Sequence, residues 1–427
     1  MTLLTELAAR AVRAPRRADA AARSLTSLHV LDTLGCVAAG ATHPLASALA
    51  AVGVPGGGGT LTVTGLPGRH SLRTAVLIES TLAHVDESDA LHPAAAVVPS
   101  AVTVPAALAV ADQERRSGRA VVDAVLAGYE TVVEAGLRFG GPRLYERSWW
   151  PTALFGGLGA AAATASLLDL DERRTVHALG IAAAGLGGLL GSDALGTGHY
   201  LLAGRAAADG VEAAYLARAG ATAAPGILDD PAAAALGTVP AGHSGAVLHL
   251  TDCAFKAYPC ARPLHAALDA LTAIGEESLP LSTARRIEIE LPEPLLRFVT
   301  ADREPPGPTE AAASAAFAVG ALLHGAVDDV SFYRGPLPPD VPDVALRPAP
   351  DLNAALPDRW SARVTVRGDD TVVRRTCEQA RPPTADAVVA RFRRRLGPTP
   401  DADARVRRYL ALDDLPEVSM LRSMSPY

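Results

Sequence analysis

The chain has 427 residues, of which 49% are hydrophobic, 20% charged and 4% aromatic, with a formal net charge of -7. It is long enough to bury one large core or two medium ones without disulfides or metal, which excludes a mini-protein and a disordered tail. Because it lacks the basic surplus that binds polyanions, we expect neither nucleic acid nor a membrane as a partner.

Cysteine and lysine are both rare. The four cysteines are too sparse and too irregularly spaced for a disulfide framework or a Cys-x-x-Cys metal site. We therefore expect a cytoplasmic protein without a metal. Lys256 is the single lysine of the chain. Composition leaves open whether it is a surface remnant or is needed for chemistry, since an ammonium can release its proton and a guanidinium cannot.

Residues 1 to about 250 are rich in Ala, Leu and Gly at helical spacing, which predicts an all-α bundle. Residues 1–25 have the spacing of one amphipathic helix and not of a signal peptide, with a transit peptide as the weaker alternative. The uncharged stretches 94–111 and 149–168 approach the length of a membrane span, but their Ala, Gly and Pro content favours buried helices. Residues 56–64 predict a β-hairpin.

The pattern changes after Cys253. Alternating residues in 286–291, 362–367 and 371–376 predict half-buried strands, so a smaller α+β domain follows the bundle. The Pro-rich run 336–350 predicts an excursion from that domain without a defined element. Residues from 384 onward predict a return to helix.

The segment from His84 to Pro93 concentrates histidines and carboxylates. Asp86, Asp89 and His92 are three residues apart, which predicts one face of a helical turn. The carboxylates would orient and charge-stabilise the imidazole of His92 for proton transfer. A solvated acidic loop and a metal site of His and Asp are the alternatives, and no known ligand spacing supports the metal.

A second candidate segment surrounds the single lysine. Lys256, Tyr258, Arg262 and His265 fall at the predicted opening of a helix. Arg262 can hold a carboxylate through two hydrogen bonds, Lys256 can neutralise developing charge, and a helix N-terminus adds its dipole. The alternative is a turn at a domain boundary with solvated charges.

Residues 157–162 match the Gly-x-Gly-x-x-Ala pattern of dinucleotide-binding loops. No good strand precedes them and no alternation of strands and helices surrounds them, so tight packing of helices explains them better. We therefore expect no nucleotide cofactor.

Several motifs occur here in the order found in one known family. They are Leu31-Asp-Thr-Leu-Gly35, His84 to Pro93, Gly156 to Ala163 with Leu167 to Leu170, Gly204-Arg205-Ala-Ala207, and Lys256 to Cys260 with His265. The chain resembles the MmgE/PrpD family over nearly its full length. That family includes 2-methylcitrate dehydratase, cis-aconitate decarboxylase and some epimerases.

The resemblance implies a mainly α homodimer, with the active site between a large helical domain and an α+β lid domain. On this basis we expect a helical domain in residues 1–252, a lid domain in 253–384 and a helical segment in 385–427 that returns to the first domain.

The resemblance also implies roles for individual residues. Catalytic positions of the family fall on Asp86 with Asp89, on His92 and on Lys256. Four polar positions depart from the family: a His, a Lys, a Thr and a Tyr are replaced by Trp150, His199, Ala90 and Phe317. We expect the substrate to contact Trp150, His199, Arg205, Tyr258, Arg262, His265 and Phe317.

These residues predict a cofactor-independent lyase that removes water from a β-hydroxy acid. In this hypothesis His92 moves a proton, Asp86 and Asp89 set its charge state, and Lys256 holds the carboxylate or stabilises enolate-like charge. The departures make the pocket less cationic and more apolar, which suits a specialised biosynthetic mono-acid better than a tricarboxylate. Decarboxylation, epimerisation, oxidoreduction and binding without turnover stay open as alternatives.

Overall fold

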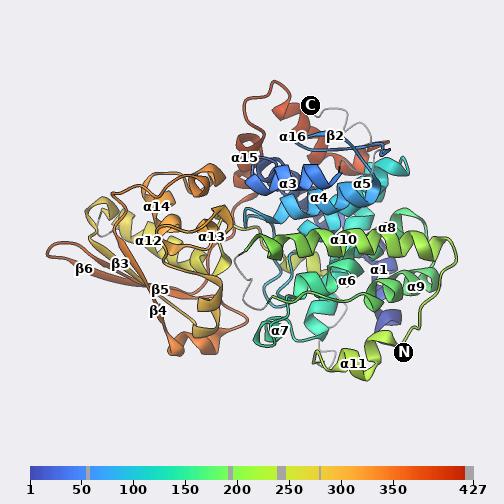
Figure 1. Cartoon of the computed structure of the whole chain (residues 1–427), viewed down its shortest axis with the longest axis horizontal. Helices are drawn as coiled ribbons and strands as arrows, with labels where there is room; N and C mark the ends of the chain where they lie inside the picture. Colours follow the sequence, from blue (N-terminus) through green and yellow to red (C-terminus); the bar gives the residue numbers. More distant parts are fainter. Residues whose placement is uncertain (54–57, 191–195, 238–246, 278–279, 419–427) are drawn as a thin grey trace.

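The computed structural model describes residues 1–53, 58–190, 196–237, 247–277 and 280–418. They form a large helical part beside a smaller α+β part (Figure 1). The predicted fold class, mainly α with a smaller α+β part, is confirmed.

Side-chain caps start many helices of the helical part. Thr2, Asp19, Ser71, Ser117 and Asp171 each accept a hydrogen bond from a backbone N–H of the first turn. The helices are α1 (Leu3–Arg17), α2 (Ala20–Gly40), α3 (Pro44–Gly53), α4 (Leu72–His84), α5 (Pro99–Gln113), α6 (Gly118–Arg138), α7 (Arg143–Glu146), α8 (Pro151–Leu167), α9 (Glu172–Ala184), α10 (Thr197–Arg218), α11 (Pro231–Ala234), α15 (Ala385–Leu396) and α16 (Ala402–Leu410).

Two sequence-based boundaries in this part are wrong. The single helix predicted for residues 1–25 is split into α1 and α2, because the Asp19 side chain accepts from the N–H of Ala22 at 2.8 Å and starts a new helix. The helix predicted from residue 94 begins at Pro99, where proline is favoured in a first turn. A hairpin forms later than predicted, from β1 (Leu61–Val63), inside the predicted range, and β2 (Leu66–His70), beyond it, while residues 54–57 lie outside the described part.

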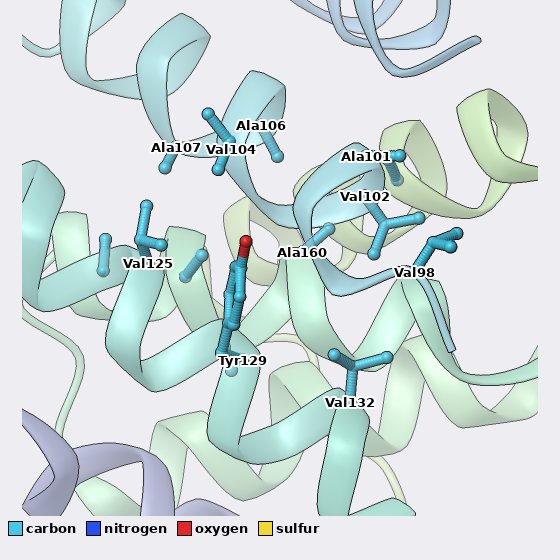
Figure 2. Packing of buried hydrophobic residues seen from close by; sticks show 14 of the residues in the cluster. Val98, Ala101, Val102, Val104, Ala106, Ala107, Val125, Tyr129, Val132 and Ala160 are labelled. Atoms are coloured by element: carbon cyan, nitrogen blue, oxygen red, sulfur yellow. The ribbon is translucent and has the colours of Figure 1, made fainter. Parts of the chain in front are cut away.

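Small residues let the central helices approach one another closely. Figure 2 shows the α6 side chain Tyr129 enclosed by alanines and valines of neighbouring helices. Gly157 and Gly159 lie inside α8, as the packing interpretation predicted, and not in a phosphate loop. A Cβ added to Gly210 of α10 would lie 2.2 Å from the carbonyl oxygen of Gly157, so α8 and α10 touch through their backbones.

The α+β part is built on a four-stranded sheet of order β4-β3-β5-β6. The predicted strands form as β3 (Arg286–Leu291), β5 (Ala362–Arg367) and β6 (Val372–Cys377), the last one residue later than expected. The apolar residues of β3 and β5 pack on α12 (His265–Glu277), α13 (Pro308–Ala312) and α14 (Ala315–Leu323).

One strand was missed. The proline-rich run holds β4 (Asp343–Pro348), which pairs parallel to β3 at the edge of the sheet. An edge strand tolerates proline because one side of its backbone needs no partner, so the prolines hid the strand without preventing it.

The C-terminal helices return to the helical part, where α15 and α16 pack on α2 (Figure 1). Their side chains Val388, Phe392, Val406 and Tyr409 belong to the same core as α1 to α10. A second core runs from Cys260 to Val366 in the α+β part.

Within the described residues, no single helix is long and apolar enough to cross a membrane. The pair Ala20–Gly40 and Pro44–Ala51, bent by 89°, passes by length and composition only.

Candidate active site

A pocket opens where the helical part meets the α+β part. It encloses about 660 Å³ of empty space, part of which is open to solvent. The helical side supplies its acidic and imidazole groups, and the segment that leads into the α+β part supplies its cations. Its polar lining residues are His84, Glu87, Tyr145, Thr152, His199, Tyr200, Lys256 and Arg262.

The loop between α4 and α5 forms one wall of the pocket. The helical turn predicted for Asp86, Asp89 and His92 is wrong, because α4 ends at His84 and the next residues are irregular. Glu87 has a positive φ of 51°, which turns the chain out of the helical path. The loop is buried, so the alternative of a solvated acidic loop is also wrong.

A short backbone pairing brings the lysine segment to this loop. The N–H of Leu91 donates to the carbonyl of Ala254 at 3.0 Å, and the N–H of Ala254 donates back at 2.9 Å. This pairing places Lys256, two residues further on, beside the acidic residues of the loop. Two segments more than 150 residues apart in sequence therefore build one site.

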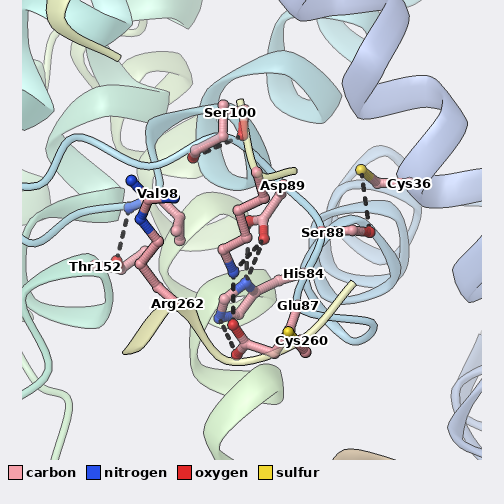
Figure 3. Close-up of polar contacts among 12 residues, drawn as sticks. Cys36, His84, Glu87, Ser88, Asp89, Val98, Ser100, Thr152, Cys260 and Arg262 are labelled. Atoms are coloured by element: carbon pink, nitrogen blue, oxygen red, sulfur yellow. Dashed lines mark hydrogen bonds and ion pairs between the residues drawn. The ribbon is translucent and has the colours of Figure 1, made fainter. Parts of the chain in front are cut away.

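His84 is oriented by a buried carboxylate. Its Nδ1 lies 3.0 Å from both carboxylate oxygens of Asp89, whose side chain has no exposed surface. A carboxylate only accepts, so Nδ1 donates to Asp89, and in the neutral ring Nε2 keeps its lone pair. The Nε2 atom is buried and, among the described residues, has no hydrogen-bond partner, with the nearest Glu87 oxygen 3.9 Å away. Figure 3 shows the three side chains converging.

Lys256 and Glu87 form the central ion pair of the pocket. The Lys256 Nζ lies 2.6 Å from Glu87 Oε2 and 3.6 Å from Asp89 Oδ1. Burial alone would lower the pKa of Lys256, but the charges of Glu87 and Asp89 outweigh it and raise that pKa above its ordinary value. Burial opposes ionisation of Glu87 as well, yet Lys256 and His84 lower its pKa to about 2.

Tyr200 completes this group. Its hydroxyl donates to Glu87 Oε1 at 3.1 Å. Burial and the neighbouring Glu87 charge raise the pKa of Tyr200 well above its ordinary value, so the phenol stays protonated.

Aromatic rings cover another wall. The N–H of Trp150 donates to the carbonyl of Gly188, and its indole stacks on the His84 imidazole with ring centroids 5.2 Å apart. His199 meets the edge of Trp150 at 4.1 Å and stacks on Tyr200. This wall fixes the plane of the His84 ring and leaves an apolar surface for a ligand.

Arg262 also lines the pocket. Its guanidinium donates through Nη1 to Nδ1 of His265 at 3.2 Å, and His265 donates through Nε2 to the carbonyl of Cys260. Burial, with the nearby charges of Arg262 and Lys256, lowers the pKa of His265 well below its ordinary value, so this histidine stays neutral. Arg262 has no carboxylate within ion-pair distance in the described part of the chain.

The chain is similar to known proteins in two comparisons. Residues 6–239 match the family model of the MmgE/PrpD N-terminal domain, which is more than half of the chain. The chain belongs to the MmgE/PrpD family. It is also 29% identical over 169 residues to the Cis-aconitate decarboxylase-like protein oryM of Aspergillus oryzae (strain ATCC 42149 / RIB 40). That match covers 38% of this chain and about a third, 35%, of the relative.

The pocket of this MmgE/PrpD member contains part of the predicted residue set. Lys256, Trp150, His199 and Arg262 line it. Asp89 and His265 lie directly behind it, each holding a lining residue. The charges of Lys256 and Arg262 are buried, so the alternative of a solvated boundary turn is wrong.

The other predicted residues lie elsewhere. Asp86 is ion-paired with Arg334 at 2.7 Å, and His92 accepts from the N–H of Ala95 and meets the edge of His249. Arg205 is exposed on α10. The Tyr258 hydroxyl donates to Asp269 at 2.6 Å, and Phe317 lines a separate cleft with Tyr333 and Arg334.

Sequence reasoning missed the roles of His84, Glu87 and Tyr200. The first two stand in the segment that was singled out, but a helical spacing was assumed there, and that spacing favoured Asp86 and His92. The usable signal was the end of the apolar helical pattern at His84, which makes the following acidic residues a loop that can fold back.

A protein holds a metal ion through clustered His, Cys, Asp and Glu side chains. Across the ranges that the structure describes, no group of three or more His, Cys, Asp or Glu side chains is arranged to hold one.

Proposed function

We propose that this MmgE/PrpD protein is a cofactor-independent lyase that removes water from a β-hydroxy carboxylic acid, with His84 as its proton-transfer group. The observation that carries the proposal is the buried His84, which lines the pocket: Asp89 binds its Nδ1, while its Nε2 has no hydrogen-bond partner among the described residues. An oriented imidazole with one free lone pair is suited to act as a general base.

In the proposed reaction, His84 Nε2 takes the proton from the carbon next to the substrate carboxylate. The electrons of that C–H bond form the new double bond as the C–O bond at the β-carbon breaks. The proton held on His84 then passes to the leaving hydroxide. Water departs, and His84 returns to its starting protonation state. Lys256 stabilises the enolate-like charge that develops beside the carboxylate.

Glu87 keeps Lys256 in its charged form. Because the pKa of Lys256 is raised and that of Glu87 is lowered, both groups stay ionised at neutral pH. Lys256 thus acts as a fixed positive charge, and His84 is left to move the proton.

Decarboxylation is the second candidate, favoured by the name of the Aspergillus oryzae relative. The same pocket would then stabilise charge left by departing carbon dioxide, and His84 in its protonated form would deliver a proton to that carbon. The two reactions share the charged intermediate and differ in the group that leaves.

Mass spectrometry on a panel of hydroxy and unsaturated acids tests both candidates. Loss of the mass of water supports the dehydratase, and loss of the mass of carbon dioxide replaces it with the decarboxylase. His84→Gln and Asp89→Asn should each lower turnover by about 10²–10⁴-fold. The exposed His324→Asn is the matched control and should keep full turnover. Full turnover in a folded His84→Gln protein would contradict the proposal.

The homodimer implied by the family resemblance is part of this proposal. Sedimentation equilibrium of the purified chain checks it, and a monomer at micromolar concentration would remove it.

A further inference from the structure

We infer that the substrate is a monocarboxylate with an apolar or aromatic body, whose single carboxylate is bound by Arg262. This inference rests on the proposed function and specifies the substrate class of the same pocket.

Without a ligand, the His84 side of the pocket already carries more negative than positive charge. The carboxylates of Glu87 and Asp89 face the ammonium of Lys256, and Asp89 is bonded in addition to His84. A second or third carboxylate of a substrate placed here would meet two buried negative charges. Such a like-charge contact in a buried site costs several kcal/mol in general.

Among the described residues, Arg262 is the pocket cation without a carboxylate at ion-pair distance. The residue is 9% exposed and lines the pocket, and its guanidinium donates to a neutral imidazole, His265, in place of a carboxylate. A buried guanidinium without an opposite charge is costly, and a bound carboxylate would remove that cost through two parallel hydrogen bonds. Burial lowers the pKa of Arg262, and the charge of Asp269, which lies beyond ion-pair distance, only partly opposes it.

His265 fixes the direction of this guanidinium. It accepts from Arg262 at Nδ1 and is itself anchored at Nε2 by the carbonyl of Cys260, 3.1 Å away. His265 is therefore a positioning residue, which leaves the other guanidinium N–H groups for the pocket.

Much of the remaining lining is aromatic or aliphatic. Tyr145, Trp150, Phe298 and Trp360 bring aromatic rings to the pocket, and the rings of Tyr145 and Phe298 are packed 4.8 Å apart. Leu91, Val98 and Pro263 add aliphatic surface. This lining fits an alkyl or aryl substituent and offers little to the extra carboxylates of a tricarboxylate.

Titration calorimetry on the full chain tests the inference without requiring turnover. The probes are butanoate, octanoate and 3-phenylpropanoate, with 3-phenylpropanamide as the neutral match of the last one and citrate as the tricarboxylate. We expect at least one monocarboxylate to bind about tenfold tighter than citrate, and 3-phenylpropanoate to bind about tenfold tighter than its amide.

Variants assign the effect to Arg262. Arg262→Gln should remove the difference between the acid and the amide, while Arg262→Lys should keep part of it. The exposed Arg285→Gln, in the same part of the molecule, should keep all of it. The His265→Phe variant should weaken acid binding and leave amide binding unchanged, which a general loss of folding would not do.

Two results would overturn the inference: citrate binding at least as tightly as every monocarboxylate, or the amide matching the acid in the wild-type protein. Because His84→Gln should bind the monocarboxylates like the wild type while losing turnover, a failure of the proposed chemistry is distinguishable from a failure of this inference.

Discussion

The two walls of the pocket carry opposite charges. The helical wall contributes the carboxylates of Glu87 and Asp89, and the facing segment contributes Lys256 and Arg262. The same polarity is repeated outside the pocket, where Asp86 of the helical part meets Arg334 of the α+β part. Each wall alone would leave buried charge uncompensated, so the packing of the two parts completes the electrostatics of the site.

Lys256→Met should have the largest effect, because it breaks the charge balance between the walls. It leaves Glu87 and Asp89 buried without their cation, which should destabilise the protein by about 3–5 kcal/mol and abolish turnover. Denaturant unfolding and turnover assays measure the two effects.

The double variant Lys256→Met with Glu87→Gln separates the loss of stability from the loss of turnover. It should regain most of the stability, because one unpaired charge is gone, but none of the turnover. A double variant as unstable as Lys256→Met would show that the ion pair does not account for the loss.

Arg391→Met tests a buried pair outside the pocket. Arg391 donates to Asp32 at 2.9 Å and to the carbonyl of Lys256 at 2.5 Å, which ties α15 and α2 to the lysine segment. Removing the guanidinium leaves Asp32 buried alone, so we expect a loss of about 3–5 kcal/mol in the free energy of unfolding.

Steady-state kinetics of the Arg391→Met protein shows whether the pair of Arg391 and Asp32 also positions Lys256. If it does, the folded Arg391→Met protein should show a lower kcat with substrate KM nearly unchanged. A stability loss below about 0.5 kcal/mol would contradict the buried-pair account.

Glu87→Gln should change how stability depends on pH. The pKa of Glu87 is lowered from 4.5 to about 2 in the folded state, so folding favours its ionised form. That contribution is complete above about pH 4.5 and is lost as the pH falls toward 2. Melting temperatures across this window should show the wild-type advantage over Glu87→Gln shrinking with falling pH. A melting-temperature difference that stays constant across this pH window would contradict the explanation.

Arg334→Gln should have the smallest effect. The pair with Asp86 is partly exposed, at 14% and 8% of the two side chains, so its loss should cost about 1–2 kcal/mol. The exposed pair of Arg347 and Glu288 is the matched control, and Arg347→Gln should change stability by less than about 0.5 kcal/mol. Equal melting temperatures for all three proteins would mean that the contact between the two parts rests on apolar packing alone.

Much of the fold could be predicted from local patterns. Strands β3 and β5 have the predicted bounds, and α15 begins one residue after the predicted return to helix at residue 384, because periodicity acts over a few neighbouring residues. The edge strand β4 was hidden by its prolines, and the break between α1 and α2 depended on a single capping aspartate.

The site was predictable only in part. Lys256 and Arg262 stood out because a single lysine and an arginine in one short segment are visible in the sequence. Asp89 was predicted to orient His92, but the structure places its carboxylate against His84. Spacing rules assume a regular helix, and the positive φ of Glu87 breaks that assumption.

The sequence by itself determined the family, the mainly helical character and the segments that carry the chemistry, because these depend on residue identity and on short-range periodicity. Only the tertiary structure decided which imidazole faces the pocket, which carboxylate holds it, and that Arg262 is left without an acidic partner among the described residues. Those choices depend on the pairing of Leu91 with Ala254, a contact between distant segments that no local pattern encodes.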